Sequence, residues 1–356
     1  MNMDALRRFV AVVMFVGTAS TIAVFSSRLS AEDADDALLK KAQKLFKPLP
    51  EQMPAPPNNP TTPEKVELGK MLYYDPRLSL SGFISCNSCH NLATFGVDNE
   101  ETSIGHKWQL GPRNAPTVLN AGFHIAQFWD GRAKDLEEQA KAPILNPVEM
   151  AVPDSMFAVD RIKSIPQYVE LFKKVFPGQE DPVNYDNIAK AIAAFERTLV
   201  TPSRFDKFLQ GDKNALTAEE KEGLKLFISK GCVSCHNGVA VGGGMYSKIG
   251  IFKPYPTEDQ GRFEITKKKS DKFVFKVPSL RNVAMTYPYF HDGKVWDLHE
   301  AVRIMGQTQL GINLKDDEIN KIVAFLKSLT GEIPEYARTL PVLPPSTPET
   351  PKPVVK

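Results

Sequence analysis

One five-residue pattern, Cys-x-x-Cys-His, occurs twice in this chain and uses all four of its cysteines. The copies are SCNSCHN at 85–91 and GCVSCHN at 231–237. On a helix, residues i, i+3 and i+4 share one face. Two thiols can therefore bond to one porphyrin edge while the following imidazole reaches the iron, which is the attachment signature of haem c. The residues predicted to hold two haems in this way are Cys86, Cys89, His90, Cys232, Cys235 and His236.

Two other chemistries compete for these cysteines. A zinc ion takes four ligands in a tetrahedral array, and the two pairs together would supply four thiolates. However, the pairs lie 146 positions apart (Cys86 to Cys232), each in its own copy of a wider repeat. A redox disulfide of the thioredoxin type would require a βαβ context, which the sequence does not show. The sequence favours haem attachment over both.

The repeat is wider than the cysteine motif. LGKMLYYDPRLSLSGFISCNSCHN resembles GLKLFISKGCVSCHN, with a short insertion in the first. APTVLN at 115–120 resembles VPSLRN at 277–282, and FWDGRAKDLEEQA at 128–140 resembles FHDGKVWDLHEAV at 290–302. A fixed order of similar segments indicates duplicated structural units. We therefore expect two similar helical domains that meet near Thr201.

Helical patterns are frequent, and no alternating β-branched run is long enough to require a large sheet. We expect a mainly α protein made of two cytochrome c-like helical domains, each with one covalently bound haem c. Helices are expected at 34–46, 63–75, 187–199, 217–227, 298–305 and 316–329. The expected divisions are an export signal or N-terminal anchor at 1–31, an N-terminal helix and Pro-rich connector at 32–64, a first haem domain at 65–200, a second at 201–340, and a Pro-rich tail at 341–356 that is extended or loosely ordered and solvated.

The N-terminus is typical of an export segment. Arg7 and Arg8 precede an apolar run at 9–25, and a polar Ser-Ser-Arg follows. Cleavage after Ala31 would place the required small residue just before the cut bond. Leu29, two positions earlier, is larger than is usual at a cleavage site. The run is close to the ~20 residues that span a bilayer, so an uncleaved anchor is the alternative. A buried N-terminal helix is a third interpretation, but both export alternatives place the body of the protein in the periplasm.

The charge balance bears on partners. Outside residues 1–31 the chain has 41 basic and 41 acidic residues, because that segment holds three of the 44 Lys and Arg and one of the 42 Asp and Glu. A net charge near zero argues against nucleic acid as a partner. The basic run TKKKSDK at 266–272 is interpreted as a solvated loop, or as a docking site for an acidic electron donor.

The sixth ligand of each iron decides what the haem can do. A filled position gives an electron carrier, whereas an open one permits chemistry on a small ligand. In the second copy the helix after Asp-Gly reaches Met305, and the matching position in the first copy is Pro143, which cannot bind iron. Met305 is thus a candidate ligand of the second haem, with Met285 as a competitor and an ordinary core methionine as the alternative. The histidines outside the motifs are His106, His124, His291 and His299, and His124 is expected to be structural.

Several motifs together resemble the bacterial dihaem cytochrome c peroxidases. The similarity spans residues 39–343. The motifs that carry it are LGKMLYYDPRLS, SCNSCHN, SIGHKWQLGPRNAPT, QFWDGRAKDLEEQAKAPI, NPVEM, GCVSCHNG, LRNVAMTYPYFHDG and AVRIMGQTQLG.

The resemblance implies different tasks for the two haems. The domain at 65–200 resembles the low-potential centre that reacts with peroxide, and the domain at 201–340 resembles the high-potential centre that receives electrons. His106 matches the family's second ligand to the first haem, released on activation, and Met305 matches the axial ligand of the second. A thioether opposite imidazole raises the haem potential, whereas two imidazoles leave it lower, which agrees with this division.

The resemblance also implies roles around the haems. Gln139 and Glu149 match residues that line the peroxide pocket, and Trp129 matches a tryptophan between the haems. Without the resemblance these would be interpreted as a surface amide, a helix-end carboxylate and a core aromatic. An ionised Glu149 in a partly dry pocket could move a proton between the peroxide oxygens. An inter-domain Ca²⁺ site is implied at Asn114, Thr286 and Pro288, the last two through backbone carbonyls.

The sequence therefore predicts an exported dihaem enzyme, by family resemblance a homodimer. It would take electrons one at a time from a small cytochrome c or cupredoxin and reduce hydrogen peroxide to water. One rival is a dihaem electron carrier, whose irons would stay six-coordinate in every redox state. Another is the dihaem enzyme that matures tryptophan tryptophylquinone, which has Tyr where Met305 stands.

Overall fold

A pair of crossed helices that meet at a glycine organises the first half of the chain. Helix α2 (Pro63–Tyr74) begins where the Thr62 side chain accepts a hydrogen bond from a first-turn backbone amide and proline occupies the first turn. It crosses α7 (Tyr185–Glu196). A Cβ on Gly69 would lie 1.8 Å from a backbone oxygen of α7, so only glycine permits this approach.

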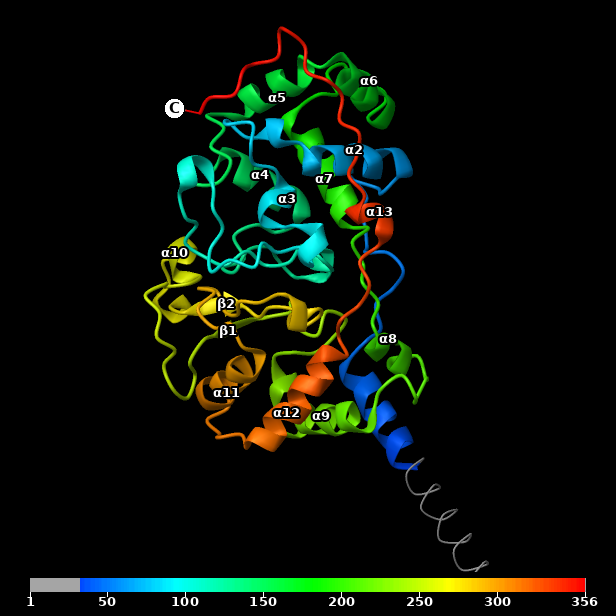
Figure 1. The fold of residues 1–356 in the computed structure, drawn as a ribbon, viewed down its shortest axis with the longest axis vertical. Helices are drawn as coiled ribbons and strands as arrows, with labels where there is room; N and C mark the ends of the chain where they lie inside the picture. Colours follow the sequence, from blue (N-terminus) through cyan, green and yellow to red (C-terminus); the bar gives the residue numbers. More distant parts are fainter. Residues whose placement is uncertain (1–32, 356) are drawn as a thin grey trace, which may run out of the picture.

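The second half repeats this arrangement. Helix α9 (Ala218–Ser229) begins with a capping box between Thr217 and Glu220, as the sequence predicts. It crosses α12 (Asp316–Lys327), and a Cβ on Gly223 would lie 1.9 Å from a backbone oxygen of that helix. Each half thus has its own glycine-mediated helix crossing, and the two halves form the upper and lower lobes of Figure 1.

The computed structural model describes residues 33–355. Residues 33–45 are helical. The further elements of the first lobe are η1 (Pro76–Leu78), α3 (Cys86–Cys89), η2 (Leu92–Thr94), η3 (His106–Trp108), η4 (Ala121–Phe123), α4 (Leu136–Leu145), α5 (Ser155–Lys163) and α6 (Pro166–Val175). The remaining elements, which come after α7 in the chain, are α8 (Arg204–Leu209), η5 (Cys232–Ser234), β1 (Tyr246–Lys248), α10 (Phe263–Thr266), η6 (Lys269–Asp271), β2 (Val274–Lys276), η7 (Val283–Met285), α11 (Leu298–Gln309) and α13 (Glu335–Arg338).

The mainly α fold class is confirmed. The described residues contain one sheet, the antiparallel pair β1–β2, in which Tyr246 lies opposite Lys276. The helices expected at 63–75, 187–199, 217–227, 298–305 and 316–329 correspond to α2, α7, α9, α11 and α12 with shifted ends. The helix expected after Asp-Gly in the first copy of the repeat corresponds to α4, whereas α5, α6 and α8 were not anticipated.

The internal repeat is visible in local backbone geometry. Asn120 and Asn282 both have left-handed backbones, with φ of 61° and 63°, and both side chains bond to the Thr201 hydroxyl at 2.8 and 2.9 Å. The helices α4 and α11 are each capped by an aspartate carboxylate, Asp135 and Asp297. Two equivalent turns therefore converge on Thr201, the residue at which we expected the two domains to meet.

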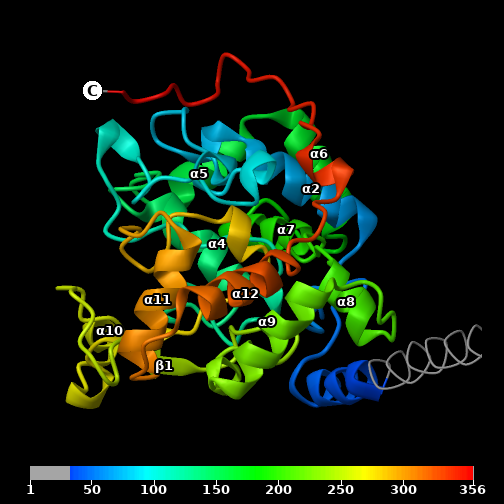
Figure 2. The same cartoon turned by 60° about the horizontal axis from the view of Figure 1, so that its bottom comes forward.

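Each lobe has its own hydrophobic core. The first core contains buried residues from Leu68 to Leu199, together with Ile333 and Ala337. The second is formed by buried residues from Phe205 to Leu329 and by one face of the helix at 33–45. This helix packs on the second lobe (Figure 2), although it precedes the first lobe in the sequence.

The Pro-rich tail is extended and most of its residues are exposed, as expected, but hydrogen bonds attach it to the first lobe at particular points. It follows α13, which packs on the first core through Ala337, and runs over the first lobe toward α5 (Figure 1). The guanidinium of Arg77 donates to the carbonyl of Pro344 at 2.8 Å, and that of Arg161 donates to the carbonyl of Lys352 at 3.2 Å. The side chain of Thr350 is buried. The proline-rich backbone has carbonyl groups free to accept, and the partly buried Arg77 and the buried Arg161 of the first lobe donate to two of them.

The predicted export segment at 1–31 lies outside the described residues. Within residues 33–355, none of the helices has the length and apolar character needed to cross a bilayer.

Candidate active site

The first cysteine motif forms a short helix that places its histidine against the lobe core. Helix α3 spans Cys86 to Cys89, and the amide of His90 donates to the carbonyl of Cys86 at 2.9 Å. The phenol of Tyr73, from α2, donates to the carbonyl of His90 at 2.5 Å. Cys86 packs against the first core. The motif is therefore anchored to the helix pair that organises this lobe.

The second motif differs in its local backbone. It forms a single 3₁₀ turn, η5, so the α-helical geometry expected there is only partly present. The amide of His236 still donates to the carbonyl of Cys232 at 3.0 Å, which keeps these side chains one helical turn apart. Cys232 packs against the second core, so the two cysteine pairs stand in separate lobes.

Both motifs fit a covalently held porphyrin. All four cysteines are free thiols, which disagrees with a disulfide within either pair. In both His90 and His236 the Nδ1 atom is buried without a hydrogen-bond partner. Burial lowers the pKa of His90, and it lowers the pKa of His236 to about 4. Neutral imidazoles are the form that ligates iron.

His106 and Glu149 are brought together by the backbone. The amide of His106 donates to the carbonyls of Val148 and Glu149 at 3.0 and 2.8 Å. A Cβ on Gly105 would lie 1.9 Å from the carbonyl oxygen of Val148, so glycine is required for this contact. The side chain of His106 is 6% exposed, and its Nδ1 has no partner. A buried histidine of ligand type thus lies directly beside the predicted catalytic acid.

Glu149 occupies a partly desolvated position. Burial raises the pKa of its carboxyl, opposed by the charge of Arg132 and by a hydrogen bond from the Asn146 side chain at 2.7 Å. Its charge also acts on Cys89 of the first motif and helps to raise the pKa of that thiol to about 11, a rise dominated by burial. Glu149 is therefore near the first cysteine pair, although these residues are 60 positions apart in the sequence.

Gln139 lies on α4, the helix that leads into the Glu149 segment. The Asp135 side chain caps this helix, and Pro143 lies within it. Because i and i+4 share a helix face, Gln139 and Pro143 lie on the same side of α4. The sequence analysis did not identify Arg132 or Asn146, since a single arginine and a single asparagine have no distinguishing pattern.

Met305 shares a face of α11 with two residues that pack on the second core. Leu298, Val302 and Met305 are at i, i+4 and i+7, and the first two pack against the core cluster that also contacts Cys232. The competitor Met285 ends the short turn η7 and is 38% exposed. The packing therefore favours Met305 over Met285 as the ligand of the second haem.

Trp129 lies at the seam between the lobes. Its indole Nε1 donates to the carbonyl of Asn114 at 2.9 Å, and its carbonyl accepts from the amide of Lys276 at 2.7 Å. Its ring lies 6.3 Å from that of His291, edge to face. The backbone amide of Asn114 in turn donates to the backbone carbonyl of His291 at 2.8 Å. Trp129 thus connects residues of both lobes through hydrogen bonds and ring contact.

The residues of the expected calcium site come from both sides of this seam. Pro288 is buried and Thr286 is partly exposed. Asn99, from the segment that precedes Asn114, donates to the carbonyl of Tyr287 at 2.7 Å. Within residues 33–355 no cluster of three or more His, Cys, Asp or Glu could hold a metal ion, so calcium at this seam would depend on carbonyl and amide oxygens.

Comparisons with known proteins agree with this geometry. The family model of di-haem cytochrome c peroxidase matches residues 63–214, and that of cytochrome c matches 220–330. The chain is 58% identical to a cytochrome c551 peroxidase of Nitrosomonas europaea, over 84% of this chain and 90% of the relative. It is 53% identical to a cytochrome c551 peroxidase of Pseudomonas aeruginosa, over 89% of this chain and 93% of the relative.

A crystal structure of a MauG-like protein associated with microbial copper homeostasis superposes with a TM-score of 0.73 at 30% identity. The match covers 82% of this chain and 98% of that protein. The agreement of two haem-binding family models with relatives of more than half identity, over nearly the whole described region, decides the family. The chain belongs to the di-haem cytochrome c peroxidases and carries two haem c groups.

Proposed function

We propose that this protein reduces hydrogen peroxide to water in the periplasm, with electrons supplied by a small cytochrome c or cupredoxin. The first haem would be held by Cys86, Cys89 and His90, and the second by Cys232, Cys235 and His236. When bound, each haem would supply a redox-active iron, and His90 and His236 are the motif residues that would ligate it. The first lobe would be the site of peroxide chemistry, and the second would receive the electrons.

The contact between His106 and Glu149 carries this proposal. It places a buried histidine, a residue type that ligates iron, and a partly desolvated acid on adjoining backbone segments within the lobe of the first motif. The imidazole of His106 would close the peroxide site at rest, and its departure would leave Glu149 facing the substrate.

The segment that carries His106 has features of a movable element. Lys107 and Trp108 both have left-handed backbones, with φ of 54° and 64°, which is unfavourable for residues with a Cβ. The Trp108 side chain is 86% exposed, so it contributes little packing energy to hold the segment in place. Strain combined with exposure is expected in a segment that leaves its position at small cost.

Two residues would act on peroxide. Glu149 takes the proton from the inner oxygen of peroxide and returns it to the outer oxygen, which leaves as one water when the O–O bond breaks; two electrons and two further protons convert the remaining oxygen to the second water. Gln139 donates a hydrogen bond from its amide and orients the substrate without competing for the proton. Each peroxide needs two electrons. Because the donor supplies them one at a time, the second lobe must store one of them. Trp129 lies between the lobes, on the route from the second lobe to the first.

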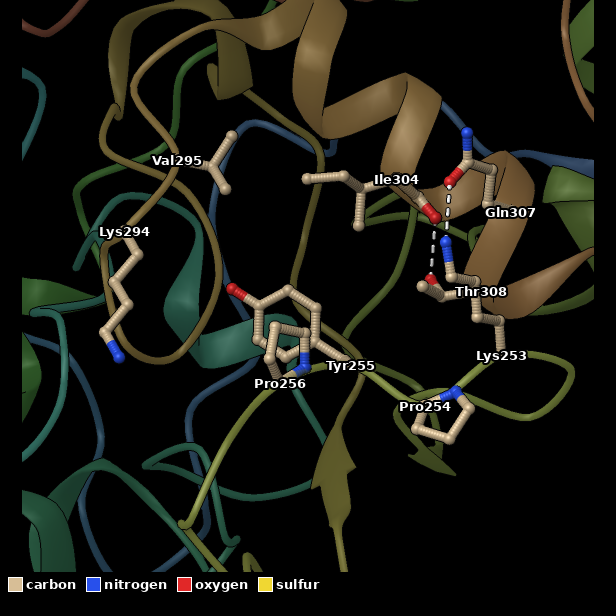
Figure 3. Close-up of a pocket in the computed structure, with 9 residues that line it drawn as sticks. All are labelled: Lys253, Pro254, Tyr255, Pro256, Lys294, Val295, Ile304, Gln307 and Thr308. Carbon is tan, nitrogen blue, oxygen red and sulfur yellow. Dashed lines mark hydrogen bonds between the residues drawn. The ribbon is translucent and has the colours of Figure 1, made fainter.

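The electron donor would bind at a pocket beside α11. The pocket has a volume of about 300 Å³ and lies between α11, which contributes Ile304 and Thr308, and the segments at 253–256 and 294–295 (Figure 3). Lys253 and Lys294 are part of its lining (Figure 3). An apolar depression with two lysines suits a small redox protein with acidic residues around its exposed cofactor edge.

Three further features are proposed on the family resemblance. Residues 1–31 would direct export and then be removed or remain as an anchor. A Ca²⁺ ion would bind at Asn114, Thr286 and Pro288, where it would tie the lobes together. The protein would function as a homodimer.

The test is peroxide turnover with reduced cytochrome c as donor. Glu149→Gln keeps the oxygen that accepts from Asn146 but cannot carry a proton, so kcat/KM for peroxide should fall by about 10²–10⁴-fold. Glu138→Gln is the matched control because this acid is exposed on α4. Burial raises the pKa of Glu149, so wild-type activity should be lost as the pH falls, at a pH above the usual glutamate value. Equal turnover in both variants would contradict the proposed role, and absence of turnover in the wild type would favour an electron carrier.

A further inference from the structure

Lys276 is a buried cation for which the described residues supply no acidic partner. Its side chain is 6% exposed, at the end of β2 in the seam between the lobes. Its amide donates to the carbonyl of Trp129, and Val277 follows it with an amide bonded to the carbonyl of Met245. The backbone at Lys276 is therefore held on both sides by hydrogen bonds to neighbouring segments. Burying an unpaired charge is costly, so such a group normally has an anionic partner.

Among the described residues, the polar side chain beside the Lys276 ammonium group is that of His124, which is also a base. The Nζ atom of Lys276 lies 3.5 Å from Nδ1 of His124, and the Nε2 atom of His124 is buried without a hydrogen-bond partner. Burial and the charge of Lys276 hold the pKa of His124 well below its usual value, and burial lowers the pKa of Lys276 to about 8. Two nitrogen groups therefore converge at a place that lacks an acceptor oxygen.

The acids of the seam are already engaged. Asp130, which follows Trp129, is bound by Arg113 at 2.5 Å and by Arg132 at 3.0 Å. Asp259 pairs with the same Arg113 at 2.6 Å. Neither carboxylate is recorded in contact with Lys276.

The backbone connects this basic pair to the second haem motif. A Cβ on Gly242 would lie 2.1 Å from the carbonyl oxygen of Pro278, two residues after Lys276. A Cβ on Gly242 would lie 3.2 Å from Nδ1 of His236, and a Cβ on the next residue, Gly243, would lie 2.4 Å from the His124 ring. The adjacent residues Gly242 and Gly243 therefore lie against the rings of His236 and His124, respectively, so the pair of Lys276 and His124 is close to the second haem motif.

We propose that Lys276 and His124 form the receptor for a propionate carboxylate of the haem held by Cys232, Cys235 and His236. A propionate is the anion that a porphyrin at this motif would bring into the seam, and it would accept from both Lys276 Nζ and His124 Nε2. Charge-assisted hydrogen bonds of this kind are among the stronger polar contacts in a protein interior. From the sequence, His124 was expected to be structural. Lys276 was not identified as a candidate, because a single lysine in a strand forms no recognisable motif.

The receptor would do two things for the second haem. It would fix the porphyrin edge at the seam, next to the backbone of Trp129 and hence toward the first lobe. It would also place a positive charge beside the haem, which stabilises the reduced form and raises the potential. Both are positioning roles, and neither depends on peroxide being the substrate.

The test is a redox titration of both haems in the mature holoprotein. Lys276→Met should lower the potential of the second haem by at least about 59 mV, a tenfold change in a one-electron equilibrium, and leave the first haem unchanged. Lys276→Arg should retain most of the wild-type potential. Lys248→Met, on the partner strand β1, removes an exposed lysine nearby and should have no effect.

A second readout reports the carboxylate itself. In infrared difference spectra of the reduced and oxidised protein, Lys276→Met and His124→Phe should each shift a propionate band that His124→Gln, which retains a donor, leaves closer to wild type. If Lys276→Met does not mature, His124→Phe and Lys276→Arg still decide the question by the same measurements. An unchanged second-haem potential with unchanged bands, or a shift confined to the first haem, would overturn the proposal, whatever the peroxidase activity.

Discussion

The buried carboxyl of Glu196 leads to a quantitative prediction about stability. Glu196 is the last residue of α7, is 3% exposed, and has an Oε2 atom without a hydrogen-bond partner. The adjacent Arg197 pairs with Glu137 at 2.8 Å instead. Burial raises the pKa of Glu196 to about 8, against the opposing charge of Arg197. Its charge also acts on Tyr73 and Cys86, which places it behind the first haem motif.

The magnitude follows from this pKa. A rise from 4.5 to about 8 corresponds to about 5 kcal/mol, at about 1.4 kcal/mol for each pH unit. Because the folded-state pKa lies above the unfolded one, the stabilising contribution is complete below about pH 4.5 and is lost as the pH rises through about 8. The free energy of unfolding of the wild type should therefore fall over this interval by up to about 5 kcal/mol from this group alone.

Glu196→Gln removes the titration and keeps the shape of the side chain. At about pH 5 the variant and the wild type should have similar free energies of unfolding, and at about pH 8 the variant should be more stable by several kcal/mol. Urea unfolding of the holoprotein, followed by circular dichroism at both pH values, measures the difference. The exposed Glu138→Gln should track the wild type at both. If Glu196→Gln also tracks the wild type, the carboxyl has a partner or solvent access that the packing does not reveal, and the reasoning fails.

Three other predictions concern the second lobe. Met305→Ala should lower the potential of the second haem and change its spectrum, whereas the exposed Met285→Ala should do neither; the reverse pattern would assign the ligand to Met285. Replacing Lys253 and Lys294 together by Glu should raise KM for the reduced donor and weaken its dependence on ionic strength, with kcat/KM for peroxide unchanged at saturating donor; an unchanged KM would place donor binding elsewhere. Gly223→Ala should cost about 3 kcal/mol or more in thermal or urea unfolding, because its Cβ would lie 1.9 Å from the α12 backbone, and a smaller loss would mean that the helices can separate.

Much of the fold could be predicted because its signals are local. The capping box at Thr217 and the proline at the start of α2 mark helix ends within a few residues. The repeat added a second line of inference, since Asp135 and Asp297 cap equivalent helices. Helices α5, α6 and α8 were not anticipated, and they are only six to ten residues long, so they offer few turns over which an apolar period can be recognised.

Some parts of the candidate site could likewise be predicted from the sequence, and others could not. The two haem motifs could be identified directly, because three ligand-type residues lie within one helical turn. The roles of His106 and Glu149 came from resemblance, and their proximity depends on hydrogen bonds between segments about 40 residues apart. The attachment of the tail to the first lobe could not be predicted, since its composition is typical of a solvated terminus. Its position depends on Arg77 and Arg161, which lie in a distant part of the chain.

The sequence by itself determined the chemistry that this chain can attach, because covalent haem binding needs residues at fixed short spacing and one helical turn brings them together. It also determined that there are two such units, because duplicated order survives in the residues. Only the tertiary structure decided which distant groups share an environment: a histidine beside an acid, a lysine without an anion, a tail held by another lobe. Burial and pairing arise from contacts between remote segments, and these energies have no period or spacing along the chain from which they could be predicted.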